Sequence, residues 1–227
     1  MVDKEILIVS DIHLGRVFNE KKFHYLCKLF SSFERIVING DFWCYYSFNF
    51  DSFLNSEWKG LFPILKSRNT TYIYGNHDLD TWMDTRVYTF CNLLDEKLFL
   101  EMGSKRYLIE HGHMDKDGKN QSEDNNKLRF MIERYINPFQ YVIIQNVQDV
   151  RKNVLSKAKI YSMNNSYKKY AKENLLQHDI YITGHTHLPE IDVENKYLNS
   201  GYIGKGFASY IVINSDGPSL KNEKYSK

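Results

Sequence analysis

Six of the eight histidines lie in short motifs with an aspartate, an asparagine or another histidine. In extended backbone, residues two positions apart place their side chains on the same side, so Asp11 and His13 could hold one ion together. The carboxylate of Asp41 has two oxygens and could bridge two ions, and Asn76 offers a carbonyl oxygen. Oxygen and nitrogen ligands without cysteine favour Mn²⁺, Fe or Zn²⁺ over Ca²⁺ or a structural zinc. His185 and His187, also two positions apart, could hold an ion in the same way.

Each of these motifs directly follows a stretch with the composition of a β-strand. Residues 6–9, 36–38, 72–74, 105–110 and 180–182 are rich in β-branched or aromatic residues and end in polar or glycine-containing turns. Segments 19–33 and 50–66 carry apolar residues at helical spacing. Alternating strands and helices predict a largely parallel sheet, whose ligands bind at the carboxyl ends of the strands. The motifs are therefore expected to meet at one edge of the sheet.

The later strand-like stretches predict a second sheet. Residues 98–100, 105–110 and 208–213 form shorter units, with a hairpin turn expected at 102–104. A mixed sheet packed against the first would accommodate them. The polar segment 216–227 is expected to fray.

Residues 115–178 have a different pattern, in which apolar residues recur at helical spacing, and predict a helical cap inserted into the domain. The segment has twelve Lys and Arg against seven Asp and Glu, a net charge of +5, whereas the whole chain has +2. This excess could be a solvated face, or it could attract an anionic substrate to a cap.

The composition bounds the class of protein. A net charge of +2 over 227 residues is too small to indicate nucleic acid or an anionic membrane as the partner. Three scattered cysteines indicate free thiols in a reducing compartment, and the first residues enter a strand pattern at once. No apolar run reaches the roughly 20 residues of a membrane span. We therefore expect a cytoplasmic protein without a transmembrane segment; peripheral membrane contact stays open.

The order of the motifs resembles the calcineurin-like metallophosphoesterase family. That family is recognised by Asp-x-His, Gly-Asp, Gly-Asn-His-Asp, His-Gly and Gly-His-x-His, which begin here at Asp11, Gly40, Gly75, His111 and Gly184. The resemblance spans residues 5–213 and implies an α/β fold of two packed mixed sheets flanked by helices, within a single domain of residues 1–227. It also implies two metal ions with Asp41 between them: Asp11, His13 and His187 on one, and Asn76, His111 and His185 on the other.

The resemblance further implies roles around the metals. His77 would donate a proton or a hydrogen bond to the leaving oxygen, and Asp78 would orient His77 or cap a helix over 79–83. Cys44 departs from the family pattern, in which an acidic residue or Asn is common, so a supporting hydrogen bond could be missing there. His113 is expected beside the ligands rather than among them.

The predicted activity is hydrolysis of a phosphodiester or pyrophosphate bond with two divalent ions, Mn²⁺ first among them. Gly40-Asp41-Phe42-Trp43, Trp82 and the insertion resemble the UDP-diacylglucosamine pyrophosphohydrolase branch, whose substrate is a lipid precursor. Enzymes of that branch often have Arg where this chain has His77. A nuclease or nucleotide phosphodiesterase is the alternative, and a catalytically silent scaffold is the less favoured one. The oligomeric state does not follow from the sequence.

Overall fold

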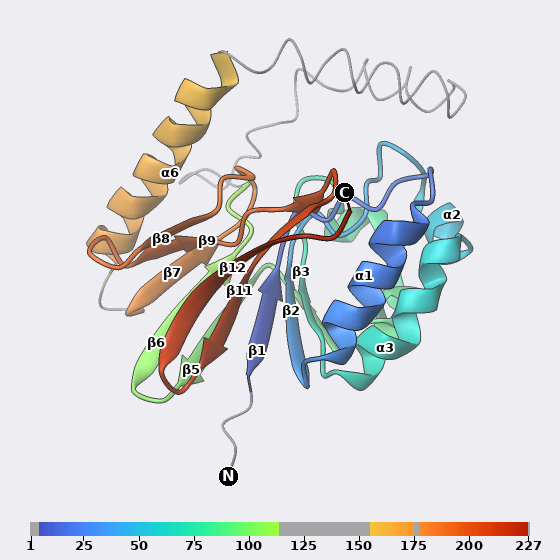
Figure 1. Ribbon diagram of the computed structural model, residues 1–227, viewed down its shortest axis with the longest axis horizontal. Helices are drawn as coiled ribbons and strands as arrows, with labels where there is room; N and C mark the ends of the chain where they lie inside the picture. Colours follow the sequence, from blue (N-terminus) through green and yellow to red (C-terminus); the bar gives the residue numbers. More distant parts are fainter. Residues whose placement is uncertain (1–4, 114–154, 175–177, 227) are drawn as a thin grey trace.

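The computed structural model describes residues 5–113, 155–174 and 178–226, and contains two mixed β-sheets (Figure 1). In spatial order, the first sheet has β10 (Ile203–Gly204), β11 (Phe207–Asn214), β1 (Ile6–Val9), β2 (Arg35–Asn39), β3 (Thr71–Ile73) and β4 (Leu93–Asp95), and β12 (Gly217–Lys224) also pairs with β11. The second has β5 (Lys97–Met102), β6 (Lys105–Glu110), β7 (Ile180–Thr183), β9 (Tyr197–Asn199) and β8 (Glu190–Asp192). The strands β1 to β4 run parallel, as do β6, β7 and β9.

Helices cover the outer faces of both sheets (Figure 1). The first sheet is covered by α1 (Glu20–Ser31), α2 (Phe50–Leu54) and α3 (Phe62–Ser67), and the second by α6 (Leu155–Glu173). Short 3₁₀ helices are η1 (Glu57–Leu61), η2 (Asp80–Trp82) and η3 (Thr85–Thr89). The result is a four-layer sandwich, helices–sheet–sheet–helix, and the predicted fold class is confirmed.

Strand alternation explains why the layers form three cores. In β1, Leu7 and Val9 pack toward the helices, whereas Ile6 and Ile8 pack between the sheets. In β7, Ile182 joins the core between the sheets, whereas Tyr181 packs toward α6. Strands that are covered on both faces read as continuous apolar runs, which is the pattern that the sequence shows.

Three predicted elements need correction. The predicted helix over 50–66 is divided into α2, η1 and α3, with Pro63 near the start of α3, where its missing N–H costs no helical hydrogen bond. The helix expected over 79–83 is only the three-residue η2. The segment expected to fray is mostly strand β12, in register with β11 from Gly217 to Lys224. Backbone pairing, rather than apolar side chains, orders that segment.

The predicted helical cap lies mainly outside the described residues. Of segment 115–178, the structure describes residues 155–174 and 178, in which α6 is helical as expected. Among the described helices, none combines the length and apolar composition needed to cross a bilayer.

Candidate metal centre

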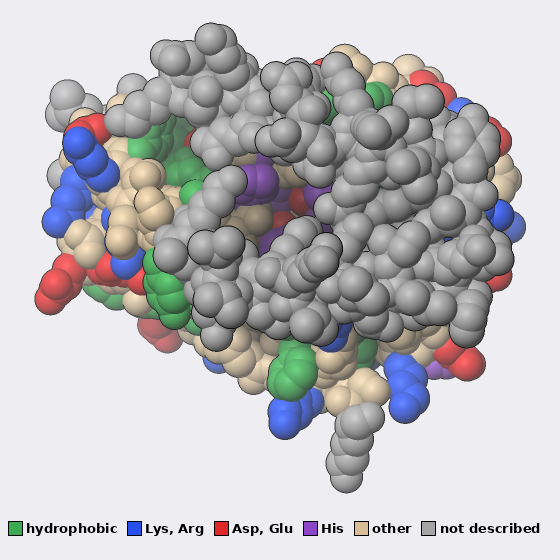
Figure 2. All heavy atoms as spheres, turned by 90° about the horizontal axis from the view of Figure 1, so that it is seen from above, with side chains coloured by type: hydrophobic (Ala, Val, Ile, Leu, Met, Phe, Trp, Pro, Cys, Tyr) green, Lys and Arg blue, Asp and Glu red, His purple; other side chains and the backbone are tan. Residues whose placement is uncertain are grey.

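The carboxyl ends of β1, β2, β3, β6 and β7 meet at one edge of the sandwich, here called the loop edge. The motif residues lie in the loops that leave these five strands. Seen from above this edge, histidine and acidic side chains lie close to one another (Figure 2). The structure therefore brings together the motif residues that are dispersed along the sequence.

One group of side chains gathers around Asp11. The Nε2 atoms of His13 and His187 are 3.1 Å apart, and His187 Nε2 is 3.1 Å from Asp11 Oδ1. His13 Nε2 also lies 3.6 Å from Asp41 Oδ2. Three ligand atoms of Asp11, His13 and His187 are thus close enough to share one ion.

A second group gathers around His111. Its Nε2 lies 3.4 Å from Asp41 Oδ1, and its ring centre is 5.2 Å from that of His185. His111 Nδ1 is 2.8 Å from the carbonyl oxygen of Asn39. Since a carbonyl only accepts, Nδ1 carries the hydrogen and donates it. The other nitrogen, Nε2, faces Asp41; it can hold a proton that Asp41 stabilises, and it offers a lone pair once that proton is lost.

Buried polar atoms without hydrogen-bond partners test whether this pocket fits a cation. Among the described residues, Asp11 Oδ1, Asn76 Oδ1 and His111 Nε2 are buried without a hydrogen bond of regular geometry, although His187 Nε2 lies 3.1 Å from Asp11 Oδ1 and Asp41 Oδ1 lies 3.4 Å from His111 Nε2. Buried polar atoms are rarely left unpaired, and metal coordination is one way of satisfying them. All three are ligand atoms that Mn²⁺, Fe or Zn²⁺ accepts, so the residues fit the expected ions.

Five of the candidate ligands have a left-handed backbone conformation. Asp11, His13, Asp41, His185 and His187 have φ between 47° and 64°. Residues other than glycine seldom adopt this left-handed region, and strain of this kind clusters at functional sites. The loops therefore turn sharply at the residues whose side chains gather at the loop edge.

Two glycines allow the loops to approach closely. Gly40 has φ of 80°, and a Cβ there would lie 2.3 Å from His111 Nδ1. A Cβ on Gly75 would lie 2.3 Å from Asp41 Oδ1. Any side chain at either position would displace a candidate ligand.

The charges of the cluster depend on one another. Burial raises the pKa of Asp11, but His187 outweighs it and lowers the value to about 2. Burial opposes a charge on His111, but Asp41 raises its pKa to about 10. Burial, together with His111, lowers the pKa of His185 to about 4. Carboxylates and imidazoles packed this tightly require a shared positive charge, whether protons or metal ions.

Cys44 supplies a contact that the sequence left in doubt. Its Sγ lies 3.3 Å from His77 Nδ1, and His77 Nε2 lies 4.0 Å from Asp41 Oδ2. The His77 ring thus has one nitrogen against the thiol and the other directed at the cluster. A hydrogen bond between position 44 and His77 is therefore present, and the Cys44 sulfur is one of its two atoms.

The predicted role of Asp78 is wrong. Its buried carboxylate accepts hydrogen bonds from the backbone N–H groups of Asp41, Phe42 and Gly75 and from the Tyr72 hydroxyl, rather than from His77. It does not cap η2 either, since Leu79 is the N-cap residue and has no side-chain cap bond. Burial and the nearby Asp41 raise the pKa of Asp78 to about 7. Through these hydrogen bonds, Asp78 fixes the position of the loop that contains Asp41.

Sequence reasoning missed two tyrosines at the loop edge. The Tyr46 hydroxyl donates to the backbone carbonyl oxygen of Asn76 at 3.0 Å, and its ring lies edge-on to His77. The Tyr202 ring stacks on His187 with centres 5.7 Å apart. Neither tyrosine belongs to a motif, so spacing alone could not identify them. His113 is buried beside His111, with ring centres 5.5 Å apart, and lies outside the two groups described above.

Solved structures with similar chain traces include an archaeal phosphodiesterase, with 15% identity, a TM-score of 0.48 and coverage of 97% of this chain and 99% of the other. YfcE, a phosphoesterase from E. coli, has 16% identity, a TM-score of 0.49 and coverage of 98% and 100%. Zinc-complexed Vps29 from Entamoeba histolytica has 14% identity, a TM-score of 0.44 and coverage of 98% and 99%.

Sequence comparison is more specific about the family. No curated protein was found to match the chain. Residues 5–214, however, match the calcineurin-like phosphoesterase superfamily domain. Because this match covers most of the 227 residues, the chain belongs to the calcineurin-like phosphoesterase superfamily, a group of metal-dependent phosphoesterases.

Proposed function

We propose that the chain hydrolyses a phosphodiester or pyrophosphate bond with two divalent ions, with Mn²⁺ as the first choice. The observation that carries this proposal is the position of Asp41. Its Oδ1 faces His111 Nε2 and its Oδ2 faces His13 Nε2, at 3.4 and 3.6 Å. A carboxylate whose two oxygens face two different groups of ligands is suited to bridging two ions.

The ligands are divided between the ions as follows. Asp11, His13 and His187 would hold one ion, Asn76, His111 and His185 would hold the other, and Asp41 would contact both. When bound, the ions would polarise the phosphoryl group and acidify a water molecule. The protein holds the ligands in place before binding, through the strained loops and through the Asp78 carboxylate that fastens Asp41.

His77 has the position of a proton donor. Its Nε2 faces the cluster and its Nδ1 is held by Cys44, so the ring cannot turn freely. We assign His77 to protonation of the leaving oxygen, a task for which a positioned imidazole is suited. Asp78 takes no part in this step.

The side chains around His77 limit the class of substrate. Tyr45 and Trp82 stack with ring centres 4.2 Å apart, and Tyr46 joins them to His77. Aromatic faces beside the leaving group suit an organic ester better than a free phosphate. A UDP-diacylglucosamine-type precursor, which the sequence resemblance favours, and a nucleotide diester both meet this condition. We place the activity in the cytoplasm, since all three cysteines are free thiols.

The test combines metal content with a substrate panel. Purified protein loaded with Mn²⁺ should contain about two ions per chain. It should hydrolyse an aryl phosphodiester, and its rates on a UDP-linked lipid, a cyclic nucleotide and single-stranded DNA should rank the substrate classes. Less than one ion per chain, with no hydrolysis of any panel member, would refute the proposal and favour a scaffold role.

A further inference from the structure

A groove lies beside the metal centre, and none of the proposed metal ligands or the proton donor lines it. It has a volume of about 430 Å³ and is lined by residues that include Pro189, Tyr202, Phe207, Ser209, Asn222 and Lys224. Tyr202 forms its border with the metal centre, because the same ring stacks on His187. Its volume lies within the range of small-molecule sites.

The groove arises where the core between the sheets ends. Along β11, Phe207, Ser209 and Ile211 share one face, and their partners on β12 are Lys224, Asn222 and Leu220. Ile211 is buried between the sheets and Leu220 packs against the same core. One pair further along the strands, the apolar pair gives way to Ser209 and Asn222. The small and polar residues leave the end of this face unfilled.

The lining offers specific contacts to a ligand. Ser209 is 5% exposed, and its Oγ has no hydrogen-bond partner among the described residues. The Phe207 ring is 47% exposed although it continues a buried face, and the Lys224 ammonium lies over it at 5.3 Å. The groove therefore combines an aromatic surface, a buried hydroxyl, an amide and a positive charge, and the Glu223 carboxylate, which also lines it, accepts a hydrogen bond from the Tyr210 hydroxyl.

The groove lies on the side of the centre away from His77. Four ring contacts run along the loop edge: Tyr46 to His77 at 4.8 Å, His77 to His13 at 4.5 Å, His13 to His187 at 5.1 Å and His187 to Tyr202 at 5.7 Å. If the leaving group departs at His77, the group that stays on phosphorus extends toward Tyr202. The groove is thus positioned for the retained part of the substrate.

We infer that this groove binds the nucleoside of a nucleotide ester, an inference that rests on the proposed function and narrows its substrate. A nucleobase presents a planar π face to aromatic rings and hydrogen-bonding edges to a hydroxyl and an amide. An acyl chain would leave the buried Ser209 hydroxyl without a partner, at a cost in desolvation, whereas the exposed Asn222 and Lys224 would keep water. The edge of a base can instead form hydrogen bonds with the hydroxyl and the amide.

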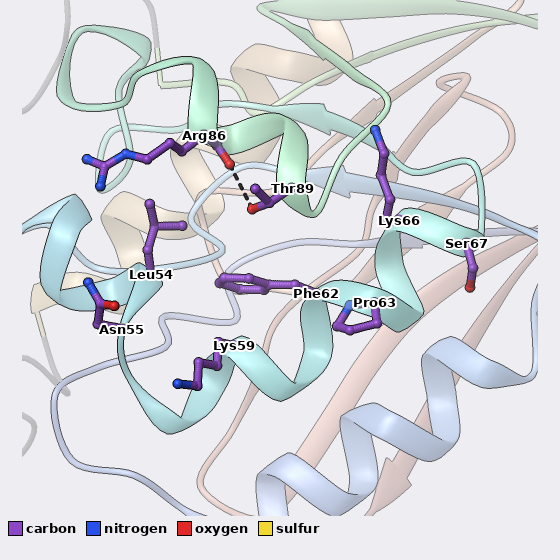
Figure 3. Close-up of a pocket in the computed structure, with 9 residues that line it drawn as sticks. All are labelled: Leu54, Asn55, Lys59, Phe62, Pro63, Lys66, Ser67, Arg86 and Thr89. Atoms are coloured by element: carbon purple, nitrogen blue, oxygen red, sulfur yellow. Dashed lines mark hydrogen bonds between the residues drawn. The ribbon is translucent and has the colours of Figure 1, made fainter.

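A second hollow, of about 700 Å³, does not compete for this role (Figure 3). It lies among α2, η1, α3 and η3, and none of the candidate ligands lines it. Its Arg86 is paired with Asp51 and Asp84, and its Lys66 donates to the Cys91 carbonyl oxygen. Its cations are largely engaged within the protein, and it does not adjoin the metal centre.

The experiment compares two esters that share one leaving group. Thymidine 5′-(p-nitrophenyl phosphate) and methyl p-nitrophenyl phosphate differ only in the retained group, so their kcat/KM ratio reports on the groove and cancels general effects on the metals. We expect the Mn²⁺-loaded protein to prefer the nucleoside ester. Phe207→Ala should lower this ratio about 5- to 100-fold, as loss of one base-stacking ring does elsewhere.

Matched controls separate the groove from the surface at large. Phe99→Ala removes a ring that is 55% exposed on the second sheet, and should leave the ratio unchanged. Lys224→Glu should lower the ratio, whereas Lys221→Glu, on the opposite face of β12, should not. A ratio near one in the wild type, a ratio that Phe207→Ala leaves intact, or a stronger preference for a decyl ester would overturn the inference.

Failure of the proposed function has a different signature. If neither ester is hydrolysed, calorimetry of thymidine monophosphate binding in EDTA tests the groove without metal. Binding that Phe207→Ala weakens and Phe99→Ala does not would support the groove. Absence of binding would overturn it.

Discussion

Asp41 and its neighbours Phe42 and Trp43 belong to two regions with opposite properties. Asp41 has a left-handed backbone and points into the loop edge, among polar atoms that lack hydrogen-bond partners. Phe42 and Trp43 are fully buried between the first sheet and its helices, where their rings pack on Phe53. We call the second region the aromatic core.

The difference between the two regions indicates how the fold tolerates the strained backbone of the loop edge. Left-handed backbone and buried unpaired groups each cost free energy, and such costs persist only where the surrounding structure fixes them. The aromatic core directly follows the strained residue and holds it by packing. Activity should therefore depend on the loop edge and stability on the aromatic core, and substitutions in each can test this division.

Asp41→Ala is expected to have the largest effect. Removing the carboxylate that faces both ligand groups should lower turnover by more than about 10³-fold and release at least one ion. Retention of both ions would refute the bridging role. Asp95→Ala, at the exposed end of β4, is the control.

His77→Ala tests the proton donor apart from the ligands. Turnover should fall by about 10²- to 10⁴-fold, the range of a general acid, while the protein keeps both ions. Metal analysis and kcat, measured on the same preparation, separate a loss of proton donation from a loss of metal. Unchanged turnover would exclude the assigned role, and His24→Ala, on the exposed face of α1, should have no effect.

Phe53→Ala tests the aromatic core. Phe53 is fully buried and contacts Trp43 and Phe62, among other rings. Its truncation should lower the free energy of unfolding by about 3–5 kcal/mol, with kcat of the folded protein nearly unchanged. Denaturant unfolding and kinetics at low temperature measure the two separately. A loss of kcat as large as that of His77→Ala would show that the two regions are not separable.

The sequence was sufficient to predict the sheet and the convergence at the loop edge. Apolar runs identify the strands, and parallel strands bring their carboxyl ends together, so Asp11 and His187 can be expected to meet although they lie 176 positions apart in the sequence. This prediction needs only chain direction and periodicity.

Other features depend on contacts that no local pattern encodes. Asp78 accepts hydrogen bonds from two segments, residues 41–42 and residues 72–75, so its sequence neighbour His77 was a misleading guide. The strand β12 is polar and is ordered by pairing with β11. Because β12 was expected to fray, the groove that Ser209 and Asn222 form across that pair could not be anticipated.

Cys44 lies at the boundary between the two regions. It is buried and contacts His77 Nδ1, so Cys44→Ala should lower kcat by about 10- to 100-fold without loss of metal. Cys44→Asn, which restores a hydrogen-bonding side chain, should recover part of the loss. Cys27→Ala, on α1, is the control. If Cys44→Asn and Cys44→Ala behave alike, the thiol contributes packing rather than a hydrogen bond.

Lys22 joins the two regions directly, because it lies on α1 and its ammonium donates to the Ile12 carbonyl oxygen between Asp11 and His13. Burial lowers the pKa of Lys22 from 10.5 to about 7. Between these values the unfolded chain binds the proton and the folded chain does not, so stability rises with pH, by about 1.4 kcal/mol per pH unit. Below about pH 7 the full cost of burying the charge is present.

Lys22→Met removes this titration. The variant should be more stable than the wild type at pH 7, and its advantage should shrink at pH 8 and 9, as measured by urea unfolding. Other groups titrate equally in both proteins and cancel in the difference. Parallel stability curves would mean that Lys22 stays charged in the fold. In that case the contact with Ile12 would be a charge-assisted hydrogen bond that stabilises the loop edge. The burial of Lys22 would then not lower the free energy of unfolding.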